Sequence, residues 1–332
     1  QGYYPEELNT YFPFSSDLAY QTDIIEYNTV TSEFYSLLNS GDVYHQRTIE
    51  SKGGVNEVYA NFSANYLNKL YIGANLSVRS YRYIEDITHL EELTDTSGTN
   101  LRSFEYDYYL KTKGSGGNLK IGVIYLVNES IRFGLALHSP TFSEMTDTWS
   151  ASMSSTFETY TKTINDSLIP TGDYKYKVRT PGRIIGSVAF VFGTKGCINI
   201  DAEYLSYKHG HFKSTSDLKY APYNYEYENN YAKQVFQDAI NIRLGGEYVV
   251  FPGFYLRAGM SYYGNAFQSN QQIELKPELI ISGGLGIKTK KFSVDISYRQ
   301  RTNKTSYYAF SNSLSTIDRT SGSAVLTAAF NF

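Results

Sequence analysis

The feature that most constrains the fold is an alternation of apolar and polar residues with a period of two, recurring from about residue 53 to the end of the chain. Successive side chains of a β-strand point to opposite faces, so this period predicts strands with one apolar and one polar face. One segment shows it clearly. There Leu70, Ile72, Ala74, Leu76 and Val78 alternate with Tyr71, Gly73, Asn75, Ser77 and Arg79.

Eleven segments repeat this pattern, and none of their apolar positions is charged. They are 53–66, 70–79, 119–125, 131–137, 184–192, 198–204, 240–248, 254–262, 279–287, 292–298 and 324–332. The sequence therefore predicts an all-β protein. Alternation alone fits both a soluble sandwich and a barrel.

The lengths of the connections separate these two folds. Short connections (67–69, 127–129, 194–196, 251–253 and 288–291) alternate with long polar ones (84–109, 141–173, 208–238, 264–277 and 302–320). Short turns at one end and long loops at the other are typical of a transmembrane antiparallel up-and-down β-barrel, with periplasmic turns and extracellular loops. Many of the 33 Tyr and 19 Phe fall at strand ends, where such a barrel carries its aromatic girdles.

Composition excludes several other classes. No stretch approaches the roughly 18 to 20 apolar residues of a transmembrane helix. The net charge of -3 gives no basic excess for nucleic acid. The one cysteine, Cys197, has no partner for a disulfide or a thiolate metal site. His209 and His211 form an isolated H-x-H pair, so we expect neither a metal nor a cofactor.

The strand order predicts two regions, an extracellular polar segment with short helices at 1–50 and the barrel strands at 51–332. The strand at 53–66 runs toward the short turns, so residues 1–50 lie outside the cell. Bacterial barrels have an even number of strands, and eleven cannot close. We expect an odd number of strands, at least one, before Gln1 or from another chain. A strand near 43–48 is the alternative.

Six motifs occur in a characteristic order: RFGLALHSPT (132–141), TPGR (180–183), NIRLGGEY (241–248), YLRAG (255–259), SGGLG (282–286) and FSVD (292–295). In this order they resemble the FadL/TodX family of outer-membrane transporters of hydrophobic compounds, in a branch sometimes labelled hemin receptors. The resemblance implies 14 strands in the complete protein and a sideways exit into the membrane. The family's N-terminal hatch, with its Asn-Pro-Ala motif, and its first strands are absent from this sequence.

Candidate ligand-binding or lumen-lining residues lie on the polar strand faces and in one loop. They are Arg79, Arg132, His138, Arg183, Arg243, Glu247, Arg257, Arg299, Tyr223 and Tyr225. Hairpin register about Asn68 and Pro252 pairs Glu57 with Arg79 and Glu247 with Arg257. Such pairs either line the path of a solute or neutralise each other's charge and keep the barrel interior rigid. Likewise, His138 either contacts ligand or bonds a neighbouring strand, and the loop tyrosines either receive an apolar solute or pack their loop.

The leading hypothesis is a channel in the Gram-negative outer membrane for uptake of hydrophobic or amphipathic small molecules, either long-chain fatty acid-like or aromatic. Its expected partners are the lipid bilayer, that ligand and further outer-membrane proteins, but no nucleic acid. The alternative is a non-transporting barrel that serves as a scaffold or a subunit of a secretion assembly. We expect no enzyme, since His138 and Ser139 are adjacent in the chain and cannot face each other as base and nucleophile.

Overall fold

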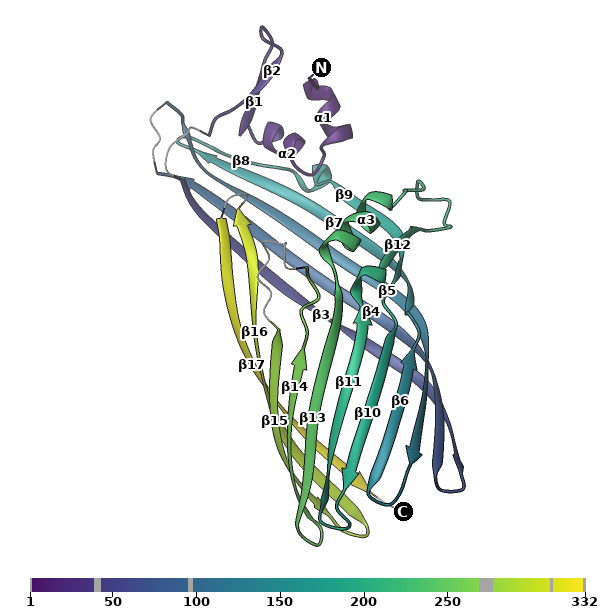
Figure 1. Cartoon of the computed structure of the whole chain (residues 1–332). Helices are drawn as coiled ribbons and strands as arrows, with labels where there is room; N and C mark the ends of the chain where they lie inside the picture. Colours follow the sequence, from purple (N-terminus) through teal and green to yellow (C-terminus); the bar gives the residue numbers. More distant parts are fainter. Residues whose placement is uncertain (1, 39–42, 95–97, 269–276, 311–312, 331–332) are drawn as a thin grey trace.

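The computed structural model describes residues 2–38, 43–94, 98–268, 277–310 and 313–330. Most of them belong to one antiparallel sheet of 15 strands. The sheet curls into a trough, with tight turns at one end and a small N-terminal lobe at the other (Figure 1). No helix in these ranges is long and apolar enough to cross a membrane.

Eleven strands form the wall of the trough, and each contains or overlaps one predicted segment. They are β3 (Val43–Tyr66), β4 (Leu70–Leu93), β5 (Leu101–Leu126), β6 (Ile131–His138), β10 (Arg183–Val191), β11 (Gly196–Ser206), β13 (Asp238–Phe251), β14 (Phe254–Tyr263), β15 (Glu278–Lys288), β16 (Phe292–Phe310) and β17 (Ser313–Phe330). The prediction of antiparallel strands joined by tight turns is confirmed. At the β3–β4 turn, Leu67 and Asn68 both have a φ of 53°, the positive value of the central residues of a type I′ turn, and the Lys69 amide closes this turn by donating to the Tyr66 carbonyl at 3.1 Å.

The sheet divides where β6 ends. β5 pairs first with β6, up to His138 opposite Lys120, and then with β7 (Phe142–Phe157), from Phe142 opposite Gly117. Residues 139–141 therefore lie opposite only two residues of β5, 118 and 119. The extra residue bends the chain between β6 and β7, as a β-bulge does. A similar break at 180–182 separates β9 (Thr171–Arg179) from β10.

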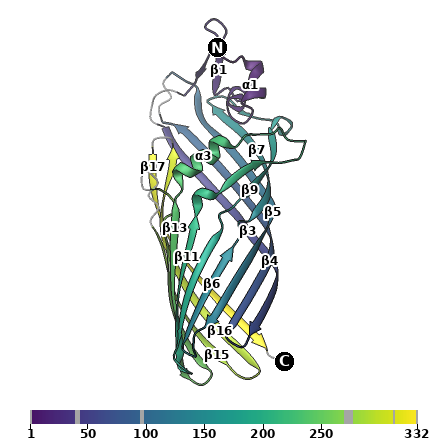
Figure 2. The same ribbon diagram turned by 45° about the vertical axis from the view of Figure 1, so that its right-hand side comes forward.

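Beyond this break the sheet continues as an upper wing (Figures 1 and 2). It consists of β7, β8 (Thr161–Thr163), β9, β12 (His211–Ser214) and residues 43–55, 81–93 and 101–116 of β3, β4 and β5. The rest of the sheet is the lower wall. The break therefore sets where the wing leaves the wall.

The wing corrects part of the sequence interpretation. Segments 84–109, 141–173 and 302–320, expected as long loops, are largely strand. β3 begins at Val43, so the alternative strand near 43–48 is the start of β3 and not an additional strand. Segment 208–238 holds η2 (Tyr207–His209), β12 and α3 (Glu226–Val235). Most of 264–277 lies outside the described residues.

The N-terminal lobe, residues 2–38, contains α1 (Pro5–Tyr11), α2 (Ser16–Gln21) and a hairpin of β1 (Ile25–Asn28) and β2 (Glu33–Ser36). It therefore contains the short helices expected there. Leu18 and Ile24 of the lobe pack with Ala151 and Met153 of β7 in one buried cluster, which Ile164 completes after β8. Next to it, η1 (Asp166–Leu168) leads into β9. The lobe is thus docked on the upper wing.

The two edges of the wall are β3 and β17. No ladder joins them within the described ranges, so the trough is an open barrel wall. In the lower wall, each strand between β3 and β17 is hydrogen-bonded to a neighbour on both sides over most of its length.

Candidate functional site

The outer face of the lower wall is an exposed belt of apolar side chains. Val58, Leu135, Ile184 and Ile281 are between 49% and 77% exposed. A two-layer sandwich would bury these side chains against a second sheet, so a closed two-layer core is excluded. The predicted division of the strands into an apolar outer face and a polar inner face is confirmed here.

The inner face of the lower wall carries charged groups that neutralise one another in clusters. In the first, Glu57 of β3 pairs with Arg79 of β4 at 3.2 Å and with Lys120 of β5. In the second, Glu203 of β11 pairs with Arg183 of β10 at 3.1 Å and with Arg243 of β13. Glu203 is only 1% exposed, so its charge depends on these two arginines.

The third cluster reaches across a strand. Arg257 of β14 donates to Glu247 of β13 at 2.7 Å and also to Asp295 of β16, on the far side of β15. The β15 position between them is Gly286, where a Cβ atom would lie 2.2 Å from the Asp295 carboxylate. The cluster therefore forms because β15 has no side chain at this point. Both predicted pairs, Glu57 with Arg79 and Glu247 with Arg257, are confirmed.

Buried polar side chains bridge the break between wall and wing. Asn118 of β5 accepts a hydrogen bond from Ser77 at 2.6 Å and donates one to Thr141 at 2.8 Å. The Thr141 amide donates to the Thr180 hydroxyl at 3.1 Å, and the Thr180 amide donates to the Thr141 carbonyl at 3.0 Å. Backbone groups freed by the two breaks thus find partners in each other.

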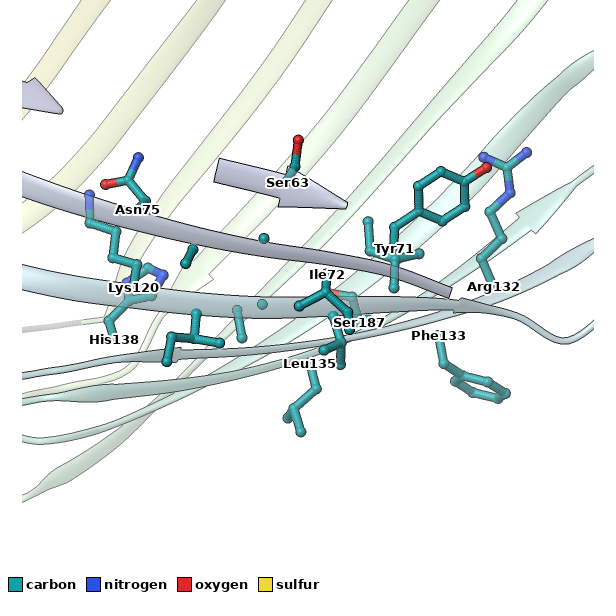
Figure 3. A pocket seen from close by; sticks show the side chains of 18 of the residues that line it. Ser63, Tyr71, Ile72, Asn75, Lys120, Arg132, Phe133, Leu135, His138 and Ser187 are labelled. Carbon is teal, nitrogen blue, oxygen red and sulfur yellow. The ribbon is translucent and has the colours of Figure 1, made fainter. Parts of the chain in front are cut away.

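A cavity of about 660 Å³ lies on the lower wall beside this bridge. Small inner-face residues leave the space, notably Gly73, Gly122, Gly134 and Ala136. Figure 3 shows Lys120, Asn75 and His138 at one end and Tyr71 with Arg132 at the other, while Phe133 and Leu135 point away on the opposite face. An apolar floor between polar ends is suited to an amphipathic or small apolar molecule.

Above the break the polarity of the two faces is reversed, and β5 shows this on one uninterrupted strand. Its outer-face positions are Ile121 and Val123 in the lower wall but Asp107, Lys111 and Lys113 in the wing. Its inner-face positions change from polar or small to aromatic. The inner face of the wing and the elements on it include Phe104, Tyr106, Tyr108, Trp149, Tyr174, Tyr176 and Phe212.

The N-terminal lobe covers part of this aromatic face. Phe14 lies 5.8 Å from the Trp149 ring, and its carbonyl accepts a hydrogen bond from Tyr106 at 2.9 Å. Ser155 of β7 donates to the Thr22 carbonyl at 2.5 Å. Burial raises the pKa of Tyr106 and of Tyr176, and the Asp147 carboxylate raises that of Tyr176 further, so both phenols stay neutral.

The predicted site residues fall into four groups. Arg79, Arg183, Arg243, Glu247 and Arg257 belong to the charged clusters, Arg132 and His138 line the cavity, and Arg299 donates to Ser323 at 2.7 Å. Tyr225 stacks on Phe212 at 5.8 Å, and Tyr223 donates to Glu228 at 2.8 Å. Tyr225 therefore packs its loop onto the wing. Sequence analysis missed the aromatic face because it assigned those segments to loops.

No known family profile matches the sequence, and no curated protein matches it. Solved structures match by fold. A Pseudomonas aeruginosa FadL homologue aligns with a TM-score of 0.54 at 11% identity, over 84% of this chain and 67% of that one. The CymD monoaromatic hydrocarbon channel aligns with a TM-score of 0.51 at 14% identity, over 86% and 76%. The chain thus has the fold expected from its resemblance to FadL-type channels.

Proposed function

Starting from this fold, we propose that the protein is an outer-membrane channel for the uptake of hydrophobic or amphipathic small molecules, either fatty acid-like or aromatic. The observation that carries the proposal is the reversal of polarity along β5, which passes from the lower wall into the wing. The apolar belt would contact lipid, and the wing would stand outside the membrane with its polar face to water and its aromatic face to the solute.

Strand length supports this arrangement. A tilted transmembrane strand needs about 9–11 residues. β3 and β4 have 24 residues each and β5 has 26, which is more than twice that length. The lower-wall strands β10 and β14, with 9 and 10 residues, are close to a single crossing. Half of each long strand is therefore free to build a binding surface above the bilayer.

A solute would meet the aromatic face first and the cavity of the lower wall next. Aromatic rings provide the solute with apolar area of defined geometry. Deeper in the wall, the charged groups are already paired with each other. They stabilise the wall, whereas the small residues of the cavity leave room for the solute. No chemical step is needed.

The position of Trp149 gives a direct test, since it is the only tryptophan of the chain. Toluene and dodecanoate, added to the purified full chain in detergent, should change Trp149 fluorescence in a saturable way. Proteoliposomes should take up the same compounds faster than empty liposomes. Trp149→Phe is the control for the optical signal and should retain uptake.

Absence of both saturable binding and uptake would overturn this function. If a stoichiometric protein partner co-purified with such an inactive barrel, the result would favour the alternative of a scaffold or subunit of an outer-membrane assembly.

A further inference from the structure

A cluster of two histidines and one glutamate lies on the inner face of the wing, next to Phe104 and Tyr106 of the aromatic surface and apart from the cavity. Nδ1 of His45 on β3 lies 3.0 Å from Oε1 of Glu91 on β4, and Nε2 of His89 lies 2.8 Å from the same oxygen. The three ligand atoms lie within 4.8 Å of one another. Within the described residues this is the one such group of three.

The ladder explains why these side chains meet. His45 is directly opposite Glu91, and His89 is two residues before Glu91 on the same face of β4. The imidazole rings are stacked, with centroids 6.1 Å apart and planes at 29°. Two regular strands therefore hold three ligand groups on one side, without any loop. Such a site is more rigid than one built from flexible segments.

The donor set is suited to a transition metal. Two imidazole nitrogens and one carboxylate oxygen are a ligand set that zinc uses when its fourth position is left for water or a bound molecule. Ligand atoms of a tetrahedral zinc ion, with bonds of about 2.0–2.2 Å, lie roughly 3.5 Å from one another. Here the Glu91 oxygen is 3.0 and 2.8 Å from the two imidazole nitrogens, and all three atoms lie within 4.8 Å of one another. To admit the ion, the carboxylate has to move away from the two nitrogens, and metal bonds then replace the two nitrogen–oxygen contacts.

The surroundings of the cluster are mostly apolar. Tyr106 and Phe104 of β5 are opposite His89 and Glu91 in the ladder. One cation, Arg47, lies opposite His89. The Glu91 side chain is 15% exposed and that of His89 is 19% exposed, whereas His45 is 38% exposed. The open position of a bound ion would therefore face the concave side of the sheet.

We propose that His45, His89 and Glu91 bind a divalent transition metal ion, such as zinc, on the inner face of the wing, where β3 begins and β4 ends. In the ion-free state the Glu91 carboxylate accepts a hydrogen bond from His89 and lies within 3.0 Å of the His45 imidazole. Binding of the ion releases any proton held between them and ties the edge strand β3 to β4. The proposal does not depend on the transport function.

The test is a titration of the folded full chain in detergent, after treatment with EDTA, with Zn²⁺ by calorimetry and with Co²⁺ by visible absorption. One high-affinity ion per chain is expected, with cobalt bands typical of nitrogen and oxygen ligands. His89→Gln and Glu91→Gln should each weaken binding by more than the roughly 10- to 100-fold that loss of a supporting second-shell partner costs. Arg47→Gln should strengthen binding, because a competing cation is removed.

His211→Gln is the matched control, since His211 lies on β12, outside the cluster, and should leave the affinity unchanged. Circular dichroism checks that every variant is folded. Absence of a stoichiometric ion in the wild type, or equal affinity in the wild type and in folded His89→Gln and Glu91→Gln, would overturn the proposal. Loss of binding in His211→Gln alone would also overturn it, because the ion would then be bound at β12 and not at β3 and β4.

Discussion

At the scale of single residues, the inner wall is governed by charge neutralisation across strands. The pair of Glu57 with Arg79 and the pair of Glu247 with Arg257 could be predicted, because a tight turn fixes which residues face each other. The contact of Arg257 with Asp295 could not be predicted this way. It crosses a third strand and depends on the missing side chain of Gly286, which only the packed sheet reveals.

The two glutamates at the centres of the first two clusters should differ in importance. Glu203→Gln removes the charge between two arginines at a buried position, and we expect it to lower the free energy of unfolding by about 3 kcal/mol. Glu57→Gln, at a position whose side chain is 26% exposed, should cost clearly less. Urea unfolding from detergent measures both. Equal costs would contradict the role assigned to burial.

Gly286 gives a second prediction at this scale. Gly286→Val places methyl groups against Asp295 and Arg257, and we expect a loss of about 1–2 kcal/mol of unfolding free energy from the disrupted charge contacts. Gly186→Val is the control, because a Cβ atom at Gly186 meets nothing within 4 Å. Similar unfolding midpoints for the two variants would show that the third cluster does not require the glycine.

At the scale of elements, the strands of the lower wall could be located from alternation alone, whereas the wing could not. In the part of β5 that belongs to the wing, residues 101–116, the alternation continues, but there aromatic residues alternate with charged ones. A tyrosine–charge pattern also occurs in polar loops. Only its pairing with β4 and β7 shows that it is strand, with its aromatic side toward the lobe.

The reversal of polarity predicts different responses to a charge at three sites. Leu135→Arg, on the outer face of the lower wall, should cost about 2–4 kcal/mol, as a cation near the bilayer midplane does. Ala136→Arg points into the trough and should cost less. Thr148→Arg, on the outer face of the wing, should be close to neutral. Folding titrations into lipid vesicles measure the three values.

A cost for Thr148→Arg as large as that for Leu135→Arg would place the wing inside the bilayer. That result would remove the aromatic surface from the route by which a solute enters.

At the scale of the whole molecule, the N-terminal lobe sits over part of the aromatic face and is held there by its contact with β7. Its position could not be predicted from the sequence. A polar segment with short helices was predicted there, but the buried contact of Leu18 with β7 joins residues more than a hundred positions apart.

Leu18→Asp should release the lobe, because Leu18 is fully buried and an unpaired carboxylate there is costly. Hydrogen exchange should then rise sharply in residues 14–25, and Trp149 fluorescence should shift as Phe14 leaves it. Val30→Asp is the control, since Val30 is 91% exposed in the lobe hairpin. Unchanged protection in Leu18→Asp would mean that the lobe is held by other contacts.

The central claim is that lipid covers the outer face of the lower wall and water covers the outer face of the wing. Spin labels on a Cys197→Ser background, placed one at a time at Ile121, Val123, Asp107 and Lys111 of β5 in lipid vesicles, test it most directly. Oxygen should reach the labels at Ile121 and Val123 far better than a water-soluble nickel chelate does, and the order should reverse at Asp107 and Lys111. Equal access to the nickel chelate at all four positions would contradict the account.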